Sequence, residues 1–364
     1  MKERFQPPPF SICIIVRNEA EAIGHCIEAL HPLQTEIIIA DTGSTDDTVR
    51  IAKDAGANVY SFEWPDDFSV ARNRVAEFAS NDLILAVDAD EILTECDRNA
   101  FAVLIQEHAG QVGMISRISP TVRNGEKQSY HERIARLYDR TLFHYTGSIH
   151  ENISSIDAGR TIQYYDLPLT FLHTGYESRE KLTEKAKRDL KMLSDAVSQK
   201  GDDPYLFYQI GKCHVALQDH KSAVACFVNG LSMKPEESAV YVREMTESYG
   251  YSLLETGQVE KALAYLLSVE SMYSYHADFC LLLGLAYMNC ARFEDAADSF
   301  FRATNCTSYS VEGTSSYRAF YNIGVIFEVL GDAKEAASWY KRCGSFAPAQ
   351  ERLQNVSVSS ATNP

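Results

Sequence analysis

The segment Leu83–Glu91, with the sequence LILAVDADE, constrains the fold of this chain more than any other stretch. Its apolar run is continuous and short, which is typical of a strand buried in a parallel sheet. Two aspartates, Asp88 and Asp90, follow the run directly. Because alternate residues of an extended chain point the same way, we expect both carboxylates to face one point beyond the carboxyl end of the strand. Open α/β sheets bind their ligands at that edge.

Two carboxylates in this position favour a divalent cation. Mg²⁺ or Mn²⁺ relieves the repulsion between neighbouring carboxylates, and these ions commonly hold substrate phosphates as well. An Asp-x-Asp pair also occurs by chance in acidic proteins, so the pair alone does not establish a metal site.

The first half of the chain alternates between strand and helix patterns. Apolar runs predict strands at 10–16, 36–40, 58–62 and 83–87, and helical patterns occupy 19–30, the stretch from a turn at 41–46 through 55, and 68–79. This alternation predicts right-handed crossovers and an α/β domain with a mostly parallel, Rossmann-like sheet. Three further strand-like stretches, at 112–119, 133–139 and 161–173, are expected to extend or flank that sheet.

The helical patterns beyond 178 repeat themselves. Four segments align on a glycine in a first helix and on small and aromatic residues in a second, and the glycines are Gly211, Gly250, Gly284 and Gly324. The pattern resembles the tetratricopeptide repeat, in which small residues lie where paired helices touch. Only the middle spacing, 250 to 284, matches the period of that family, so the others require inserted loops such as 305–316.

These patterns predict four consecutive parts of the chain. They are an α/β domain at 1–176, a linking amphipathic helix at 177–203, about four all-α repeats at 204–356 and a disordered tail at 357–364.

Composition argues against several classes of protein. The 364 residues carry a net charge of −16, so no basic excess is present to neutralise the phosphates of a nucleic acid. The nine cysteines are scattered and form no Cys-x-x-Cys pair, so we expect no structural zinc site and a reducing, cytoplasmic setting. The amino terminus has no apolar signal core, and no apolar run of about 18 residues predicts a transmembrane segment.

Polar segments follow the predicted strands in turn. They are Arg17–Ala20, Asp41–Asp46, Ala71–Asn73 and Asp88–Glu91. With the motifs CIIVRNEA, IIIADTGSTDDT, FSVARN and VDADE, the chain resembles family 2 glycosyltransferases of the GT-A fold. The motifs cover residues from about 10 to 91, and weaker similarity reaches about 175. With its repeats, the chain resembles the bacterial enzymes that glycosylate Cys or Ser side chains of bacteriocin peptides.

The resemblance implies a UDP-sugar donor, with UDP-glucose or UDP-GlcNAc expected, and it gives Asp41 the task of accepting a hydrogen bond from the uracil N3–H. The other expected donor contacts are Val16, Asn18, Glu19, Ser44, Arg72 and Ala89. Asp46 is expected to be the N-cap of the helix that follows. Alternatively, Asp41 and Ser44 merely begin that helix, and Arg72 is a surface cation.

The resemblance also implies that Asp88 and Asp90 hold Mn²⁺ or Mg²⁺ across the diphosphate of the donor, where the metal stabilises the departing nucleoside diphosphate. His173, in the segment FLHTGY, matches a third metal ligand of related enzymes, and a neutral imidazole suits Mn²⁺. The alternative is a core or loop histidine. Glu91 is expected to be a solvated or capping residue.

Inverting sugar transfer needs a base that faces the leaving group from the opposite side of the sugar. The segment Gly147–Glu151, GSIHE, resembles a pattern of the repeat-bearing subgroup, which implies Glu151 as the base. His150 is then expected to orient the acceptor or contact the diphosphate. The usual Glu-Asp pair of the family is absent, and the alternative is that His150 and Glu151 merely end a strand.

Two further sets of residues are expected near the substrates. Lys185 and Arg188 resemble a Lys-x-x-Arg pattern of the subgroup and would close over the diphosphate, unless they form a solvated charged face of their helix. The segment Tyr130–Arg133 and Arg136 are expected to line the acceptor cleft.

Two functions of different classes remain. The first is an inverting, metal-dependent hexosyltransferase acting on a Ser, Thr or Cys side chain of a peptide or protein, or on a cell-surface or lipid-linked glycan. Its repeats would present the acceptor or form a homodimer. The second is a catalytically dead scaffold that binds sugar nucleotides, and the intact motifs argue against it. A nucleotidyltransferase would need a glycine-rich basic loop after the first strand, and Arg17–Ala20 contains no glycine.

Overall fold

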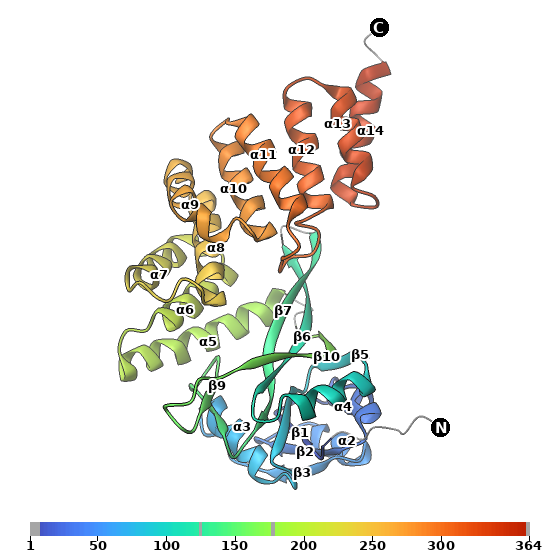
Figure 1. The fold of residues 1–364 in the computed structure, drawn as a ribbon, viewed down its shortest axis with the longest axis vertical. Helices are drawn as coiled ribbons and strands as arrows, with labels where there is room; N and C mark the ends of the chain where they lie inside the picture. The colour runs from blue at the N-terminus through green and yellow to red at the C-terminus, as the bar shows by residue number, and fades with distance from the viewer. Residues whose placement is uncertain (1–7, 124–125, 176–178, 362–364) are drawn as a thin grey trace. The chain divides into compact units, whose positions relative to one another are not determined.

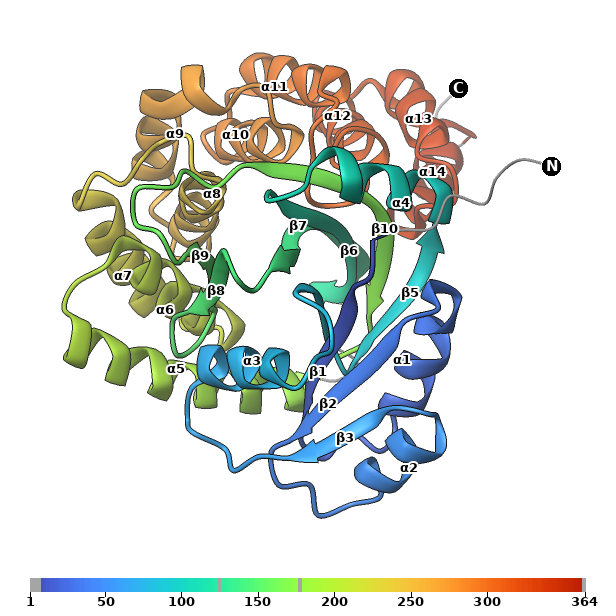
Figure 2. The same cartoon turned by 60° about the horizontal axis from the view of Figure 1, so that its bottom comes forward.

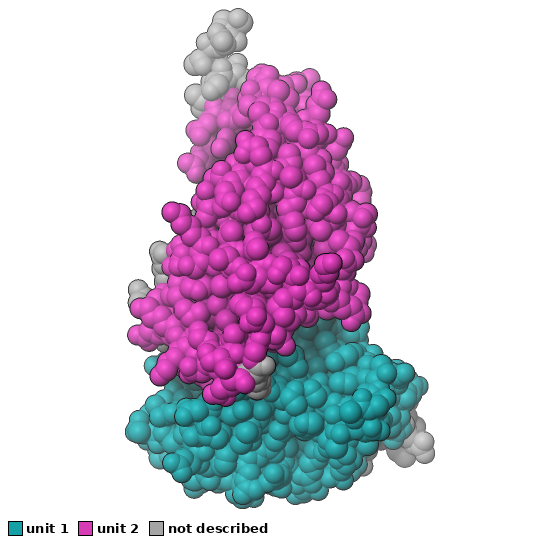
Figure 3. All heavy atoms as spheres, turned by 90° about the vertical axis from the view of Figure 1, so that its left-hand side faces the viewer, with its two compact units in different colours: residues 1–181 teal, residues 182–364 magenta. Residues whose placement is uncertain are grey.

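The computed structural model describes residues 8–123, 126–175 and 179–361. Contacts divide the chain into two compact units, Met1–Lys181 and Leu182–Pro364 (Figure 3). The first unit is built of strands and helices and the second of helices alone, which confirms the predicted fold class. The boundary between the units falls within helix α5 (Arg179–Lys200), which occupies the predicted linking segment.

An eight-stranded sheet in the order β3-β2-β1-β4-β7-β6-β10-β5 forms the centre of the first unit (Figures 1 and 2). Its strands are β1 (Ser11–Val16), β2 (Glu36–Asp41), β3 (Asn58–Ser61), β4 (Leu83–Asp88), β5 (Glu91–Cys96), β6 (Val112–Arg123), β7 (Glu126–Asp139) and β10 (Tyr164–His173). The first four strands pair in parallel, whereas β7 runs antiparallel to both β4 and β6, and β5 runs antiparallel to β10. The first four strands and the three later strand-like stretches are confirmed, and β5 is a strand that the sequence patterns did not reveal.

Both faces of the sheet are covered. Helices α1 (Ile23–Leu30), α2 (Thr48–Asp54) and α4 (Arg98–Glu107) pack on one face, and helix α3 (Phe68–Glu77) packs on the other with the hairpin of β8 (Phe143–Thr146) and β9 (Asn152–Ser155). Successive side chains of a strand point to opposite faces. Ile12 and Ile14 of β1 therefore join the first layer, while Cys13 between them joins the second. This two-sided burial explains why β1 reads as a continuous apolar run.

The second unit begins within α5 and continues as consecutive helix pairs followed by a last helix. The helices are α6 (Pro204–Ala216), α7 (His220–Ser232), α8 (Val240–Glu255), α9 (Val259–Tyr273), α10 (Ala277–Asn289), α11 (Phe293–Asn305), α12 (Tyr317–Val329), α13 (Ala333–Arg342) and α14 (Ala347–Ala361). The segment 306–316, between α11 and α12, supplies the loop that the long repeat spacing required. Helix α14 runs to Ala361, so the expected disordered tail is helical from Ser357 to that point, and 362–364 lie outside the described residues.

Glycines allow the two helices of a repeat to approach closely. A Cβ at Gly284 of α10 would lie 2.5 Å from Cε1 of Phe300 on α11, and a Cβ at Gly324 of α12 would lie 2.6 Å from Cε1 of Tyr340 on α13. Both aromatic rings are completely buried. In these two repeats, the glycine of the first helix therefore packs directly against the aromatic ring of the second.

Two negative findings concern the described part of the chain. None of its helices combines the length and apolar character needed to cross a membrane. The nine cysteines, all within the described ranges, are free thiols rather than disulfides.

We expect Gly284→Ala to destabilise the repeats by about 1–3 kcal/mol, because the added methyl group would overlap the buried ring of Phe300. The measurement is urea unfolding of a Trp64→Phe background, in which Trp339 of α13 is the remaining tryptophan. Ser268→Ala on the exposed face of α9 is the control and should leave the midpoint nearly unchanged. A second change, Phe300→Leu, should recover part of the loss, and equal stability of Gly284→Ala and the parent would contradict the packing argument.

Candidate active site

The segments that follow β1 and β2 are joined to each other by hydrogen bonds. The side-chain oxygen of Asn18 accepts from the Thr45 amide at 2.8 Å, and the Asn18 amide donates to the Ser44 hydroxyl at 2.9 Å. The Glu19 amide donates to the Thr48 hydroxyl at 2.7 Å. Asn18 has a φ of 57°, a conformation that asparagine adopts more readily than most residues. The expected donor contacts Asn18, Glu19 and Ser44 are therefore brought together at the carboxyl edge of the sheet.

Asp41 ends β2 and is only 6% exposed. Its carboxylate accepts hydrogen bonds from the amides of Gly43 at 3.3 Å and Ser44 at 3.2 Å. A carboxylate offers about four acceptor positions, so Asp41 keeps capacity for a further donor. The neighbouring Val16 carbonyl accepts both the amide and the hydroxyl of Thr42 at 2.9 Å. Val16 and Asp41 are thus fixed side by side at the ends of paired strands.

The alternative in which these residues begin a helix is wrong. Helix α2 begins at Thr48 with Asp47 at its N-cap position, so neither Asp41 nor Ser44 begins it. Asp46 lies one residue earlier, and its carboxylate accepts from the amide of Thr48, the first helical residue, at 3.0 Å and from the Ala20 amide at 3.2 Å. The hydrogen bonds from Thr48 lower the pKa of Asp46. This link holds 17–22 as a turn, which explains why α1 begins at Ile23 instead of 19.

The two aspartates of the Asp-x-Asp pair have different partners. Asp88 is the last residue of β4, whereas Ala89, itself buried, and Asp90 form the turn into β5, so the alternation of an extended strand does not continue to Asp90. Oδ2 of Asp90 lies 3.1 Å from Nε2 of His173, at the end of β10. The amide and hydroxyl of Thr174 donate to the Asp90 carbonyl at 2.9 and 3.0 Å. The carboxylate of Asp88 turns instead to arginines, contrary to the expectation of one shared point.

Asp90 and His173 suit a divalent cation. A carboxylate and an imidazole are ligands for Mg²⁺ or Mn²⁺, which complete their coordination with water and substrate phosphates. A Cβ at Gly175 would lie 3.1 Å from Nε2 of His173 and closer still to Oδ2 of Asp90, so only glycine lets the chain pass this near both side chains. Within the described ranges, no three His, Cys, Asp or Glu side chains form a metal-binding group, so such a cation would depend on oxygens of the donor.

Asp88 lies between two buried arginines. Its Oδ1 accepts from Arg72 of α3 at 2.6 Å, and its Oδ2 accepts from Arg136 of β7 at 2.5 Å. Burial raises the pKa of Asp88, but the charges of Arg136 and Arg72 outweigh that effect and hold the pKa well below its usual range. Arg136, expected in the acceptor cleft, is thus committed to the interior, and Arg72 is not a surface cation.

Glu91 was expected to be solvated or capping, and this is wrong because its side chain is 0% exposed. Its carboxylate accepts from the Asp88 amide at 3.0 Å, from Arg136 at 3.0 Å and from Arg117 of β6 at 3.3 Å. Arg117 also donates to Glu132 of β7 at 2.7 Å. Only Glu91 of β5 is buried, and a glutamate buried so completely needs cationic partners. The one signal in the sequence is its position directly after the Asp-x-Asp pair.

The segment 147–151 forms the loop between β8 and β9. Gly147 has a φ of 100° and His150 a φ of 51°, so the chain turns sharply at both positions and does not continue as a strand. The Ser148 carbonyl accepts from the Phe68 amide at 2.9 Å, which fixes the loop to the start of α3.

Glu151, the expected base, forms an ion pair with Nε of Arg72, and Nη2 of the same arginine donates to Asp88. Burial lowers the pKa of Arg72, but Asp88 and Glu151 outweigh that effect and hold the pKa well above its ordinary value. One buried arginine therefore joins the expected base to the Asp-x-Asp pair. We call the following set the charge cluster: Arg72, Arg117, Arg136, Asp88, Glu91, Glu132 and Glu151.

Comparison with known proteins finds a family match in each half of the chain. Residues 11–161 match the model of glycosyl transferase family 2, and residues 204–237 and 317–350 match the tetratricopeptide repeat. Residues 11–161 form a family 2 glycosyltransferase domain. The helical unit that follows this glycosyltransferase domain is a set of tetratricopeptide repeats.

Several relatives share this chain's sequence. A TPR repeat-containing protein of Synechococcus elongatus is 32% identical over 68% of this chain and 62% of its own length. The glycosyltransferase SunS of Bacillus subtilis is 27% identical over 60% of this chain and 53% of its own length. The chain thus spans little more than half of the curated relatives it matches. The crystal structure of MamA aligns with 49% of this chain at a TM-score of 0.38 and 15% identity.

The remaining expected residues lie on β7 or in the other unit. Arg133 of β7 pairs with Asp166. Arg188 lies on α5, is exposed and pairs with Asp189 at 2.8 Å, and Lys185 lies on the same helix. The closing of Lys185 and Arg188 over a diphosphate stays a prediction.

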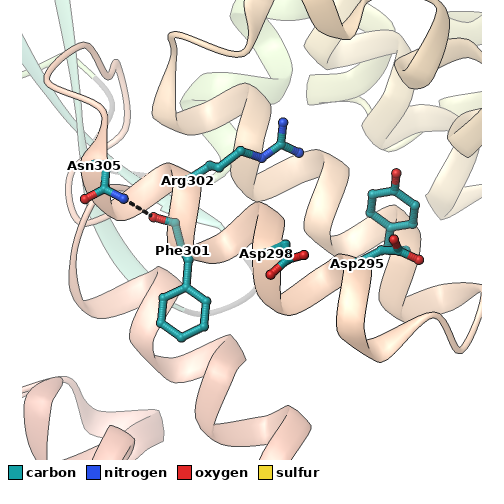
Figure 4. A pocket seen from close by; sticks show the side chains of 6 residues that line it. Asp295, Asp298, Phe301, Arg302 and Asn305 are labelled. Carbon is teal, nitrogen blue, oxygen red and sulfur yellow. Dashed lines mark hydrogen bonds between the residues drawn. The ribbon is translucent and has the colours of Figure 1, made fainter.

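A shallow hollow on the repeats carries no comparable chemistry. It lies on α10 and α11 and is lined by Tyr287, Asp295, Asp298, Phe301, Arg302 and Asn305 (Figure 4). The Asn305 amide donates to the Phe301 carbonyl at 3.0 Å, and Arg302 pairs with Glu270 at 2.5 Å. These groups bind neighbouring protein atoms, and we assign the hollow no function.

We expect Asp88→Asn and Asp90→Asn to affect stability very differently. Asp88→Asn removes the shared partner of two buried arginines and should cost about 3–5 kcal/mol. Asp90 is about a quarter exposed, and its ion-pair partner within the described residues is His173, so its change should cost about 1 kcal/mol or less. The measurement is urea unfolding of a Trp339→Phe background, in which Trp64 reports on the glycosyltransferase domain. Equal losses would contradict the division of roles.

Proposed function

We propose that this chain is an inverting, metal-dependent glycosyltransferase that moves a hexose from a UDP-sugar to a Ser, Thr or Cys side chain of a peptide or protein. The family 2 domain supports the class of reaction. The observation that carries the donor proposal is the joined pair of loops around Asp41, because it lies at the same sheet edge as Asp90 and His173. Parallel strands end together at that edge, where α/β sheets bind ligands.

The uridine site is proposed around Asp41. Its buried carboxylate, already fixed by the amides of Gly43 and Ser44, would accept a hydrogen bond from the uracil N3–H. A buried acceptor rejects a base that offers no donor in that position, because the remaining acceptor position of the carboxylate would be left unfilled. The backbone of Val16, Asn18 and Glu19 would line the base and ribose. UDP-glucose and UDP-GlcNAc are the proposed donors.

The diphosphate site is proposed at the turn after β4. Asp90 and His173 would hold Mn²⁺ or Mg²⁺ there, with the backbone of Ala89 beside the phosphates. The bound metal would supply positive charge to the leaving UDP as its bond to the sugar breaks. Lys185 and Arg188 would add to that charge if α5 closes over the donor.

Glu151 is proposed as the general base and His150 as a residue that orients the acceptor. Glu151 would take the proton of the acceptor hydroxyl or thiol, whose oxygen or sulfur attacks C1 of the sugar. The bond between C1 and the UDP oxygen breaks as the new bond forms, so the configuration at C1 inverts. The ion pair with Arg72 and the anchored loop fix the position of the carboxylate.

The repeats are proposed to present the peptide or protein acceptor, because stacked helix pairs form extended surfaces suited to peptide chains. The same surfaces offer a second possibility, a homodimer. The two roles need separate measurements. Analysis of the glycosylated products tests acceptor binding, and light scattering gives the oligomeric state.

We expect the purified chain to release UDP slowly from UDP-glucose or UDP-GlcNAc in the presence of Mn²⁺, because water can replace the acceptor. Chelation with EDTA and the substitution Asp90→Asn should each abolish release, whereas Asp298→Asn on the repeats should not. The measurements are UDP release by coupled assay and UDP binding by calorimetry. Binding of UDP without release from any UDP-sugar would support the scaffold hypothesis instead, and absence of both binding and release would exclude a UDP-sugar donor. Mass spectrometry of candidate peptides then identifies the acceptor.

We expect Glu151→Gln to keep the affinity for UDP within about threefold but to lower sugar transfer by about 10²–10⁴-fold, the usual effect of losing a general base. Glu77→Gln, at the exposed end of α3, is the matched control and should retain full turnover. Undiminished transfer by Glu151→Gln excludes this residue as the base.

A further inference from the structure

Glu91 is the most deeply buried acid of the charge cluster. Its side chain is 0% exposed, whereas the side chains of Asp88, Glu132 and Glu151 are 26%, 28% and 12% exposed. Removing a carboxylate from water costs several kcal/mol unless hydrogen bonds and opposite charges compensate. The groups around Glu91 therefore have to compensate for its burial.

The two oxygens of Glu91 have separate partners. Oε2 accepts from the backbone amide of Asp88 at 3.0 Å, and Oε1 accepts from Arg136 at 3.0 Å and Arg117 at 3.3 Å. One carboxylate thereby fixes the main chain of the β4–β5 turn relative to two guanidinium groups. The turn carries Asp90 at its other end.

The contacts continue outward from this point to the expected base. Arg136 uses one nitrogen for both Glu91 and Asp88, Asp88 gives its other oxygen to Arg72, and Arg72 reaches Glu151. Glu91 therefore lies at the inner end of an alternating series of charges whose outer end is Glu151. A guanidinium that lost its inner partner would be free to shift toward the remaining carboxylates.

We propose that Glu91 is a positioning residue for sugar transfer, which sets the orientation of Asp88 and Arg72 and, through them, of Glu151. This inference rests on the proposed function. Glu91 touches neither donor nor acceptor in this proposal, so it should affect the rate of transfer more than the affinity for UDP.

The substitution Glu91→Gln isolates the ionic contacts. A glutamine can still accept from the Asp88 amide through its carbonyl oxygen. Its NH₂ group, however, would face Arg117 and Arg136, which are donors only. The variant thus keeps the shape and the backbone bond but loses the contacts to both arginines. Glu95→Gln is the matched control, because Glu95 lies on the same strand, is exposed and bonds to Thr170.

The experiment compares the wild-type chain, Glu91→Gln and Glu95→Gln. UDP release and peptide transfer give kcat and KM, and calorimetry with UDP and Mn²⁺ gives the Kd and the fraction of competent sites. We expect Glu91→Gln to lower kcat by about ten- to a hundredfold, the effect of losing a charged hydrogen bond. Its Kd for UDP should change by less than about threefold, with a full complement of sites, and Glu95→Gln should match the wild type.

A double-mutant cycle tests the route of the effect. If Glu91 acts through Arg136, Glu91→Gln and Arg136→Gln together should lower kcat by clearly less than the product of the single effects. The double variant also keeps the net charge of the wild-type cluster, because it removes one acid and one arginine, so it can be measured if Glu91→Gln alone does not fold.

Three outcomes overturn the inference. Wild-type kcat in Glu91→Gln excludes a positioning role, and so does a loss of kcat that equals the loss of UDP-binding sites, which a purely structural role would produce. Strictly multiplicative effects in the cycle exclude the route through Arg136 on which the inference depends. Failure of the proposed function is recognised separately, because the wild-type chain itself would then show no turnover with any UDP-sugar.

Discussion

The ion pairs of Asp88 with Arg72 and Arg136 are the interactions on which the rest of the glycosyltransferase domain depends. The two arginines come from α3 and β7, and the cluster continues to β5, β6 and the β8–β9 loop. It thereby ties the four parallel strands on one side of the sheet to the mixed strands on the other. Buried ions are costly unless nearly every partner is in place, so this arrangement stabilises one register of these elements over its alternatives.

This network also separates the two aspartates of one short motif. Because β4 ends at Asp88, that residue still points as a strand residue does and meets the arginines. Asp90 lies in the turn, where Thr174 and Gly175 bring His173 against it. A motif of three residues thus serves two purposes, one inside the protein and one at the sheet edge. The difference of conformation between a strand and a turn is sufficient to produce this division.

The predictable parts of the fold are those with short-range patterns. Apolar runs located β1 to β4, and the glycine and aromatic periodicity located the repeats, because each pattern reflects packing that recurs along the chain. The loops around Asn18 and Asp41 were found through their residue types. The cluster was not, because Arg72 and Glu151 are 79 residues apart and Asp88 and Arg136 are 48 apart. No local pattern specifies which buried charge meets which, and β5 was missed because its first residue, Glu91, looked solvated.

The charge balance of the cluster bears on the need for a metal. Its three arginines face four carboxylates, so the cluster keeps an excess negative charge, and Asp41 and Asp90 at the same edge of the sheet add two more. The arginines are committed to these acids and have little positive charge to offer a diphosphate. Charges of one sign repel strongly where water is scarce. A donor diphosphate would therefore need to bring a divalent cation, and Asp90 with His173 is the pair of side chains that offers it ligands.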